Sequence, residues 1–156
     1  MSTRLDATPL HDAGVYSLLG ALVAVLAPHL AHIPTWVSIA VAAMLAWRAW
    51  LAWHGGSLPR KWLLVPLTVL GTAGVVMSYG PRLGRDASVA LLAIMLALKM
   101  LELKALRDAT VAVCLGFFLI ITNFLYSQTI PSALYMLAAM TWLTATLVAF
   151  QDRAHA

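Results

Sequence analysis

The sequence predicts an all-α fold, a polytopic membrane bundle of about six transmembrane helices. Of its 156 residues, 62% are hydrophobic and only 10% are charged, and the mean hydropathy is +0.88. An ordinary soluble domain is roughly 45–50% apolar and about 25% charged, so this chain has too few polar side chains to cover a water-exposed globule. The apolar residues also form runs long enough to cross a bilayer, which takes about 20 residues of helix.

Prolines and short polar loops separate six apolar runs. Pro28 and Pro34 end the first run, the loop HGGSLPRK follows the second, and Pro66 lies in the first turns of the third, where its missing N–H has no intrahelical partner. Because all connections are short, we expect consecutive helices to be antiparallel neighbours in one integral-membrane domain over residues 1–156. The expected helices cover residues 14–30, 35–53, 62–79, 87–103, 109–126 and 132–150.

The positions of Lys and Arg predict the orientation of these helices. With the N-terminus in the cytoplasm, eight of the ten Lys and Arg residues fall on the cytoplasmic side, and only Arg82 and Arg85 fall outside. Cytoplasmic loops of membrane proteins carry an excess of these residues, so both termini are expected in the cytoplasm. The first run is not expected to be a cleaved signal peptide, because a cleavage site after Ala27 would place Pro28 next to the scissile bond.

Charges concentrate at the two ends of the fourth helix and in the turn that follows it. Lys99 lies 13 positions beyond Asp86, which is about 20 Å of helix, and a charge at the bilayer centre costs about 2.5–3.5 kcal/mol. Either Lys99 extends to the headgroups and pairs with Glu102, or the two residues fix helix packing or engage a lipid or protein partner. The candidate structural or functional charges are Arg85, Asp86, Lys99, Glu102, Arg107 and Asp108.

Two similar hexapeptides begin helices, RDASVA at Arg85 and RDATVA at Arg107. An internal duplication is conceivable, but the match stops after six residues. We expect Asp86 and Asp108 to cap helix N-termini, where an acidic side chain also faces the positive end of the helix dipole.

Small residues form two faces that permit close helix contact. These faces comprise Gly14, Ser17 and Ala21 in the first helix, and Gly71, Gly74 and Ser78 in the third. Asn123 is expected to make an interhelical or interfacial hydrogen bond. Four tryptophans are expected at the inner membrane interface, namely Trp47, Trp50, Trp53 and Trp62.

No residue pattern indicates a catalytic or metal site. His29 and His32 are spaced i, i+3, but no acidic or cysteine ligand is near them. Cys114 lies in an apolar helix that disfavours its thiolate, so ordinary packing is expected. No cofactor and no nucleic-acid partner are expected, because the basic residues are dispersed. The expected partner is the lipid bilayer, with other membrane or periplasmic envelope proteins as further candidates.

An ordered set of charged and aromatic segments resembles the N-terminal membrane region of the bacterial transglutaminase-like TgpA proteins. The shared segments include PHL with IPTW in the first turn, and then Gly84–Asp86, Leu98–Glu102, Arg107–Asp108, GFFL at 116–119 and FLYSQ at 124–128. The resemblance implies a location in the bacterial inner membrane. It also implies that the membrane domain is followed in that family by an extracytoplasmic transglutaminase-like domain with a Cys, His, Asp site and by a further membrane helix.

This chain has only QDRAHA after Phe150, so none of the family's catalytic residues carries over and Cys114 is not their nucleophile. We expect a non-enzymatic domain that anchors and regulates the transglutaminase-like part. The alternative is a self-contained small membrane protein that binds or transports a small molecule or lipid, with Lys99, Glu102 and Asn123 along the path.

Overall fold

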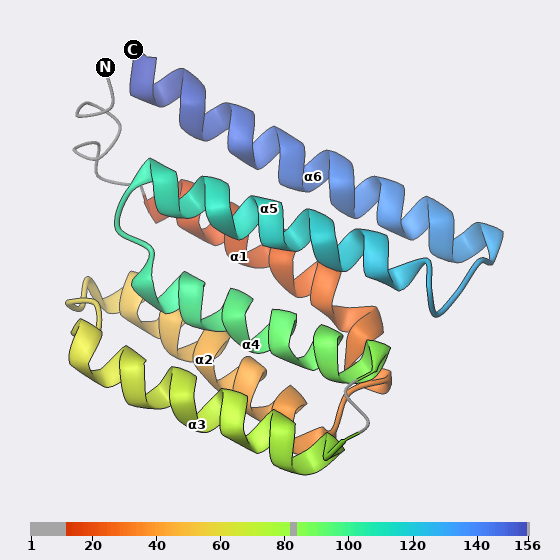
Figure 1. The fold of residues 1–156 in the computed structure, drawn as a ribbon. Helices are drawn as coiled ribbons and strands as arrows, with labels where there is room; N and C mark the ends of the chain where they lie inside the picture. The colour runs from red at the N-terminus through yellow and green to blue at the C-terminus, as the bar shows by residue number, and fades with distance from the viewer. Residues whose placement is uncertain (1–11, 82–83, 156) are drawn as a thin grey trace. The chain divides into compact units, whose positions relative to one another are not determined.

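A computed structural model of the chain describes residues 12–81 and 84–155. This part of the chain is helical, with short loops between the helices (Figure 1). The all-α prediction is confirmed, and each expected helix is present with ends that differ by at most five residues. The helices are α1 (Asp12–Leu26), the 3-10 helix η1 (Ala27–Ala31), α2 (Thr35–His54), α3 (Lys61–Tyr79), α4 (Arg85–Glu102), α5 (Leu106–Asn123) and α6 (Ile130–His155).

Five stretches of helix are long and apolar enough to cross a membrane. They are Gly14–Ala31, Thr35–His54, Lys61–Tyr79, Leu106–Asn123 and Ile130–Asp152. The sequence interpretation counted α4 as a sixth span, but this helix carries Arg85, Asp86, Lys99 and Glu102 within 18 residues. By length and composition, five of the six α-helices therefore have the properties of a membrane span.

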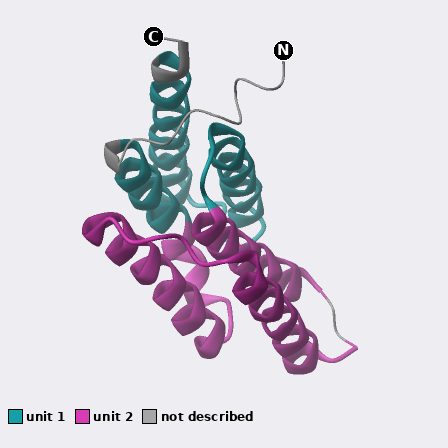
Figure 2. Cartoon of the chain, turned by 90° about the vertical axis from the view of Figure 1, so that its left-hand side faces the viewer, with its two compact units in different colours: residues 1–25, 103–156 teal, residues 26–102 magenta. Residues whose placement is uncertain are grey.

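The chain divides into two compact units (Figure 2). Unit 1 comprises residues 1–25 and 103–156 and contains α1, α5 and α6. Unit 2 comprises residues 26–102 and contains η1, α2, α3 and α4.

In unit 2, α4 packs against both α2 and α3. Ten of its 18 residues are buried. The small face of α3 is a contact face, as predicted: a Cβ atom at Gly71 would lie 3.0 Å from Ile94 of α4, and one at Gly74 would lie 2.8 Å from the Trp36 ring of α2. The Trp36 indole N–H also donates to the Ser78 hydroxyl over 3.1 Å. Small side chains thus let α3 approach both neighbours.

In unit 1, α6 presents one face to the protein. The buried residues recur every three or four positions, as in a helix with a single apolar stripe; they are Met136, Ala139, Leu143, Thr146 and Phe150. The small face of α1 contacts this stripe, because Gly14 lies against the Phe150 ring. Gly116 of α5 has the same role, since a Cβ atom there would lie 2.8 Å from Leu143 and 3.0 Å from Leu22.

Two prolines interrupt the backbone ladder after α1, as the sequence predicted. Pro28 has no N–H for the carbonyl of Ala24, four residues earlier, and the α-helix ends at Leu26 and continues as η1. In unit 1, the Tyr135 hydroxyl of α6 donates to that Ala24 carbonyl over 2.7 Å. The single expected helix over residues 14–30 is therefore an α-helix followed by a 3-10 turn, which exposes a carbonyl for another helix.

Candidate functional site

A buried arginine lies in the apolar helix α2. Arg48 is 7% exposed, and its Nε–H donates to the carbonyl of Met100 over 3.1 Å. Met100 belongs to the last turn of α4, whose carbonyls lack partners inside the helix. A cation at this end of a helix also faces the negative end of the helix dipole. Arg48 therefore acts as a C-terminal cap supplied by a neighbouring helix.

In a continued α-helix, the carbonyl of Met100 would accept a hydrogen bond from the N–H of Lys104, four residues later. That N–H donates instead to the Asp108 carboxylate over 3.3 Å, and the N–H of Ala105 donates to the same oxygen over 3.4 Å. Asp108 is 9% exposed. The predicted capping role is thus confirmed for Asp108 in a modified form, because its carboxylate binds the turn before α5 and not the first N–H groups within the helix.

Lys99 and Glu102 form the ion pair that one of the two interpretations predicted. The Lys99 ammonium lies 3.2 Å from Glu102 Oε2, and the two side chains are 20% and 37% exposed. At such exposure, solvent screening reduces the energy of an ion pair to a few tenths of a kcal/mol up to about 1 kcal/mol. The pair keeps two charges at the end of α4 locally neutral.

Within unit 2, the four candidate charges of α4 do not form one site. Arg85 and Asp86 form a long contact of 3.8 Å at the start of α4, with both side chains half exposed. Lys99 and Glu102 lie at the other end of this helix, about 20 Å away by helix rise. Arg107 is exposed in the first turn of α5. These residues lie at helix ends.

A polar cluster joins α1 and α6 in unit 1. The hydroxyls of Ser17 and Thr146 are 2.9 Å apart, and the Trp142 indole N–H donates to Ser17 over 3.3 Å. Asn123, which is 3% exposed, donates to the Ser132 hydroxyl over 3.2 Å. The predicted interhelical role of Asn123 is therefore confirmed, with α5 bonded to α6.

The sequence reasoning did not single out Arg48 or Thr146. A lone arginine within an apolar run is a signal that could have identified Arg48. Thr146 offers no such signal, because its role depends on which face of α6 is buried.

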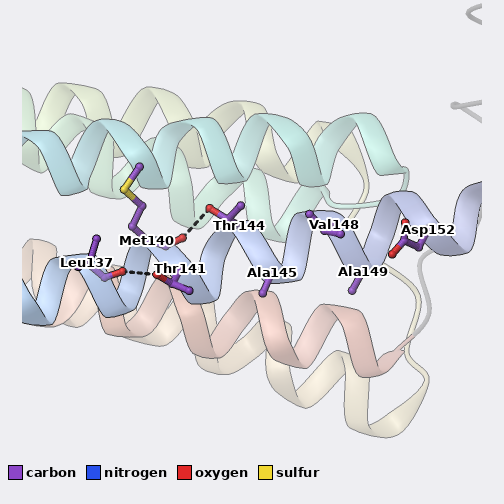
Figure 3. Close-up of a pocket in the computed structure, with 8 residues that line it drawn as sticks. All are labelled: Leu137, Met140, Thr141, Thr144, Ala145, Val148, Ala149 and Asp152. Atoms are coloured by element: carbon purple, nitrogen blue, oxygen red, sulfur yellow. Dashed lines mark hydrogen bonds between the residues drawn. The ribbon is translucent and has the colours of Figure 1, made fainter.

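The outer face of α6 carries a shallow groove of about 620 Å³ (Figure 3). Its lining comes from α6 alone and is mainly apolar. The Thr141 and Thr144 hydroxyls in it donate to carbonyls of their own helix, Leu137 and Met140, over 2.8 Å each. The groove thus offers an apolar surface with its hydroxyl donors already used.

Within residues 12–81 and 84–155, no group of three His, Cys, Asp or Glu side chains could hold a metal ion. Cys114, for which ordinary packing was expected, is exposed on α5. Its thiol lies on the outward-facing side of this helix. His29 is buried in η1, and His32 is exposed.

Taken together, the five apolar stretches of membrane-spanning length indicate an all-α protein of the membrane type. The chain belongs to the TgpA N-terminal domain family, whose sequence profile matches residues 17–156. This match confirms the resemblance predicted from the charged and aromatic segments.

A curated relative gives the family its context. The chain is 39% identical over 139 residues to the protein-glutamine gamma-glutamyltransferase of Pseudomonas aeruginosa strain PAO1. The alignment covers 89% of this chain and 21% of the relative, so the chain spans about a fifth of that protein's length. No solved structure matches the chain.

Proposed function

We propose that this chain is the membrane-embedded N-terminal domain of a transglutaminase-type protein, which it anchors and regulates without catalysing a reaction itself. The observation that carries the proposal is the apolar exterior of the helices. The α3 span has a mean hydropathy of 1.6, yet only 11% of it is buried. Its exposed side chains include Val65 at 62%, Leu70 at 69% and Met77 at 84%. A surface this apolar is stable in hydrocarbon and unstable in water.

The family match supports the link to a transglutaminase. The relative named a protein-glutamine gamma-glutamyltransferase contains a matching region of about a fifth of its length. The catalytic part of such a protein would lie in the remaining length. The paired charges and bonded hydroxyls of this chain suit helix packing, which is what an anchor requires. The small-molecule or lipid carrier gains no support from Lys99, Glu102 or Asn123, because each is engaged by a neighbour.

We infer that α4 is a sixth span that crosses the bilayer inside the protein. Its 18 residues extend about 27 Å, close to the roughly 30 Å of hydrocarbon, and it packs against two apolar spans. Its four charges lie in the first two and last four residues, and the middle is uncharged. Charged residues are tolerated where neighbouring helices shield them. Six spans place both termini on one side, and the excess of Lys and Arg favours the cytoplasm of the bacterial inner membrane.

Cysteine labelling in intact cells tests this topology. In a Cys114→Ala background, single cysteines replace Gly84 before α4 and Lys104 after it, both exposed in the structure. A membrane-impermeant maleimide should label the Gly84→Cys variant in intact cells and the Lys104→Cys variant only after permeabilisation. Equal labelling of both in intact cells would show that α4 does not cross the membrane. Release of the chain from membranes by alkaline carbonate would refute the anchoring role.

A further inference from the structure

Two tryptophans project from adjacent helix ends in unit 2. Trp53 lies in the last turn of α2 and is 82% exposed, and Trp62 is the second residue of α3 and is 89% exposed. Each indole is large and apolar but carries one N–H donor, a combination that favours the boundary between hydrocarbon and headgroups. Their exposure thus suits a position of the α2–α3 connection at the level of lipid headgroups.

The same connection carries positive charge without a compensating acid. Arg60 and Lys61 are both exposed, and the sequence contains no Asp or Glu between residues 13 and 85. The two carboxylates of α4 pair within their own helix, Asp86 with Arg85 and Glu102 with Lys99. Neither Arg60 nor Lys61 therefore has a carboxylate partner there.

Glu102, at the end of α4, is the acid of unit 2 that lies nearest to the α2–α3 connection, and it already has a cationic partner. The contact between Arg48 and Met100 places the last turn of α4 beside the C-terminal part of α2. Glu102, which ends α4, is held by the Lys99 ammonium at 3.2 Å. This end of unit 2 thus has a surplus of positive charge that calls for an anionic partner.

We propose that Trp53, Arg60, Lys61 and Trp62, here called the basic-aromatic collar, bind the phosphate headgroups of anionic phospholipids. The two cations would donate hydrogen bonds to headgroup phosphates, and the two indoles would lie beside the glycerol region of the same lipids. A lipid fits better than an acidic protein, because the charges sit between two tryptophans at the ends of two apolar spans. The proposal rests on the membrane embedding proposed above and adds a lipid class and a location to it.

Lipid selectivity of the reconstituted chain tests the proposal. The chain is placed in phosphatidylcholine vesicles with a trace of spin-labelled phosphatidylglycerol or spin-labelled phosphatidylcholine, and electron paramagnetic resonance gives the protein-bound fraction of each label. A basic residue near an anionic surface changes binding by about fivefold. We expect phosphatidylglycerol to be preferred, and the Arg60→Gln/Lys61→Gln variant, which removes two such residues, to lower that preference by up to about 25-fold. High salt should weaken the preference of the unmodified chain, because it screens exposed charges.

A matched control removes the same charge elsewhere. The Lys104→Gln/Arg107→Gln variant also loses two exposed cations, from unit 1, and should keep most of the preference. The exchanged variant Arg60→Lys/Lys61→Arg should keep it fully. An equal loss in the Lys104→Gln/Arg107→Gln control would overturn the proposal by showing that the preference follows total charge. Equal binding of both labels by the unmodified chain would overturn it too, even with full incorporation and helicity, and would leave the anchoring role intact. Failure of the chain to enter vesicles would overturn both.

Discussion

Replacing the buried arginine by methionine tests whether the end of α4 depends on α2. In the Arg48→Met variant, the Met100 carbonyl loses a charged donor at 3.1 Å. A hydrogen bond to a charged group contributes about 1.5–3 kcal/mol, and a cation at a helix C-terminus adds about 0.3–1 kcal/mol. Against this, the variant no longer buries a guanidinium that is 7% exposed, which recovers part of the desolvation cost. We expect a net loss of about 1–3 kcal/mol.

The assay is unfolding of the purified chain in mixed micelles, with increasing dodecyl sulfate and circular dichroism as the readout. Lys104→Met is the matched control, because this lysine side chain is exposed, and it should change stability by less than about 0.5 kcal/mol. Hydrogen exchange provides a local readout, since the amides of the last turn of α4 should lose protection in Arg48→Met. An Arg48→Met variant as stable as the unmodified chain, with unchanged exchange in that turn, would refute the reasoning.

Three further predictions concern helix contacts, each measured by the same unfolding assay. Tyr135→Phe removes the donor to the α1 carbonyl at 2.7 Å and should lower the unfolding free energy by about 0.6–1.7 kcal/mol. Tyr16→Phe, at an exposed tyrosine, should change it by almost nothing. Equal effects of the two variants would contradict the role of this hydrogen bond. Gly116→Val should lower the unfolding free energy by about 1–3 kcal/mol through overpacking. Gly116→Ala should lower it less, because the nearest atoms are leucine methyls that can rotate. A valine variant of unchanged stability would argue against the close contact. The double variant Lys99→Met/Glu102→Gln should lose less than about 1 kcal/mol, and a larger loss would give the pair a role beyond local neutralisation.

The sequence predicted the helices well because apolar runs and prolines act locally. Run length and hydropathy identified all six α-helices, and Pro28 marked the point where α1 ends. The rule of about 20 apolar residues per span also counted α4, although its charges exclude it by composition. The rule takes no account of packing. In the folded chain α4 packs against two other helices, and these neighbours can shield its charges.

Side-chain partners were harder to predict, as two similar hexapeptides show. Asp86 and Asp108 follow an arginine in nearly identical sequences. Asp86 is half exposed beside Arg85, whereas Asp108 is 9% exposed and binds two backbone N–H groups. For Asp108, the two N–H groups belong to Lys104 and Ala105, which precede the hexapeptide and are not part of the repeated sequence. Arg48 is a similar case, because its partner lies 52 residues away in the sequence.

Several polar contacts in this apolar protein occur where the helical backbone ladder is broken. Pro28 and Pro34 each leave the carbonyl four residues earlier without its usual N–H partner. The first carbonyl accepts from the Tyr135 hydroxyl over 2.7 Å, and the second accepts from the Ser38 hydroxyl over 3.4 Å. Side-chain donors thus replace the donors that proline lacks.

The end of α4 follows the same rule without a proline. The Lys104 N–H that would serve Met100 is taken by Asp108, and Arg48 donates to the freed carbonyl. In a bilayer an unsatisfied carbonyl costs several kcal/mol, so each break in a helix creates a demand for a donor from elsewhere. A position where proline or a turn interrupts an apolar helix therefore requires a partner side chain, and Tyr135, Ser38 and Arg48 meet that requirement here.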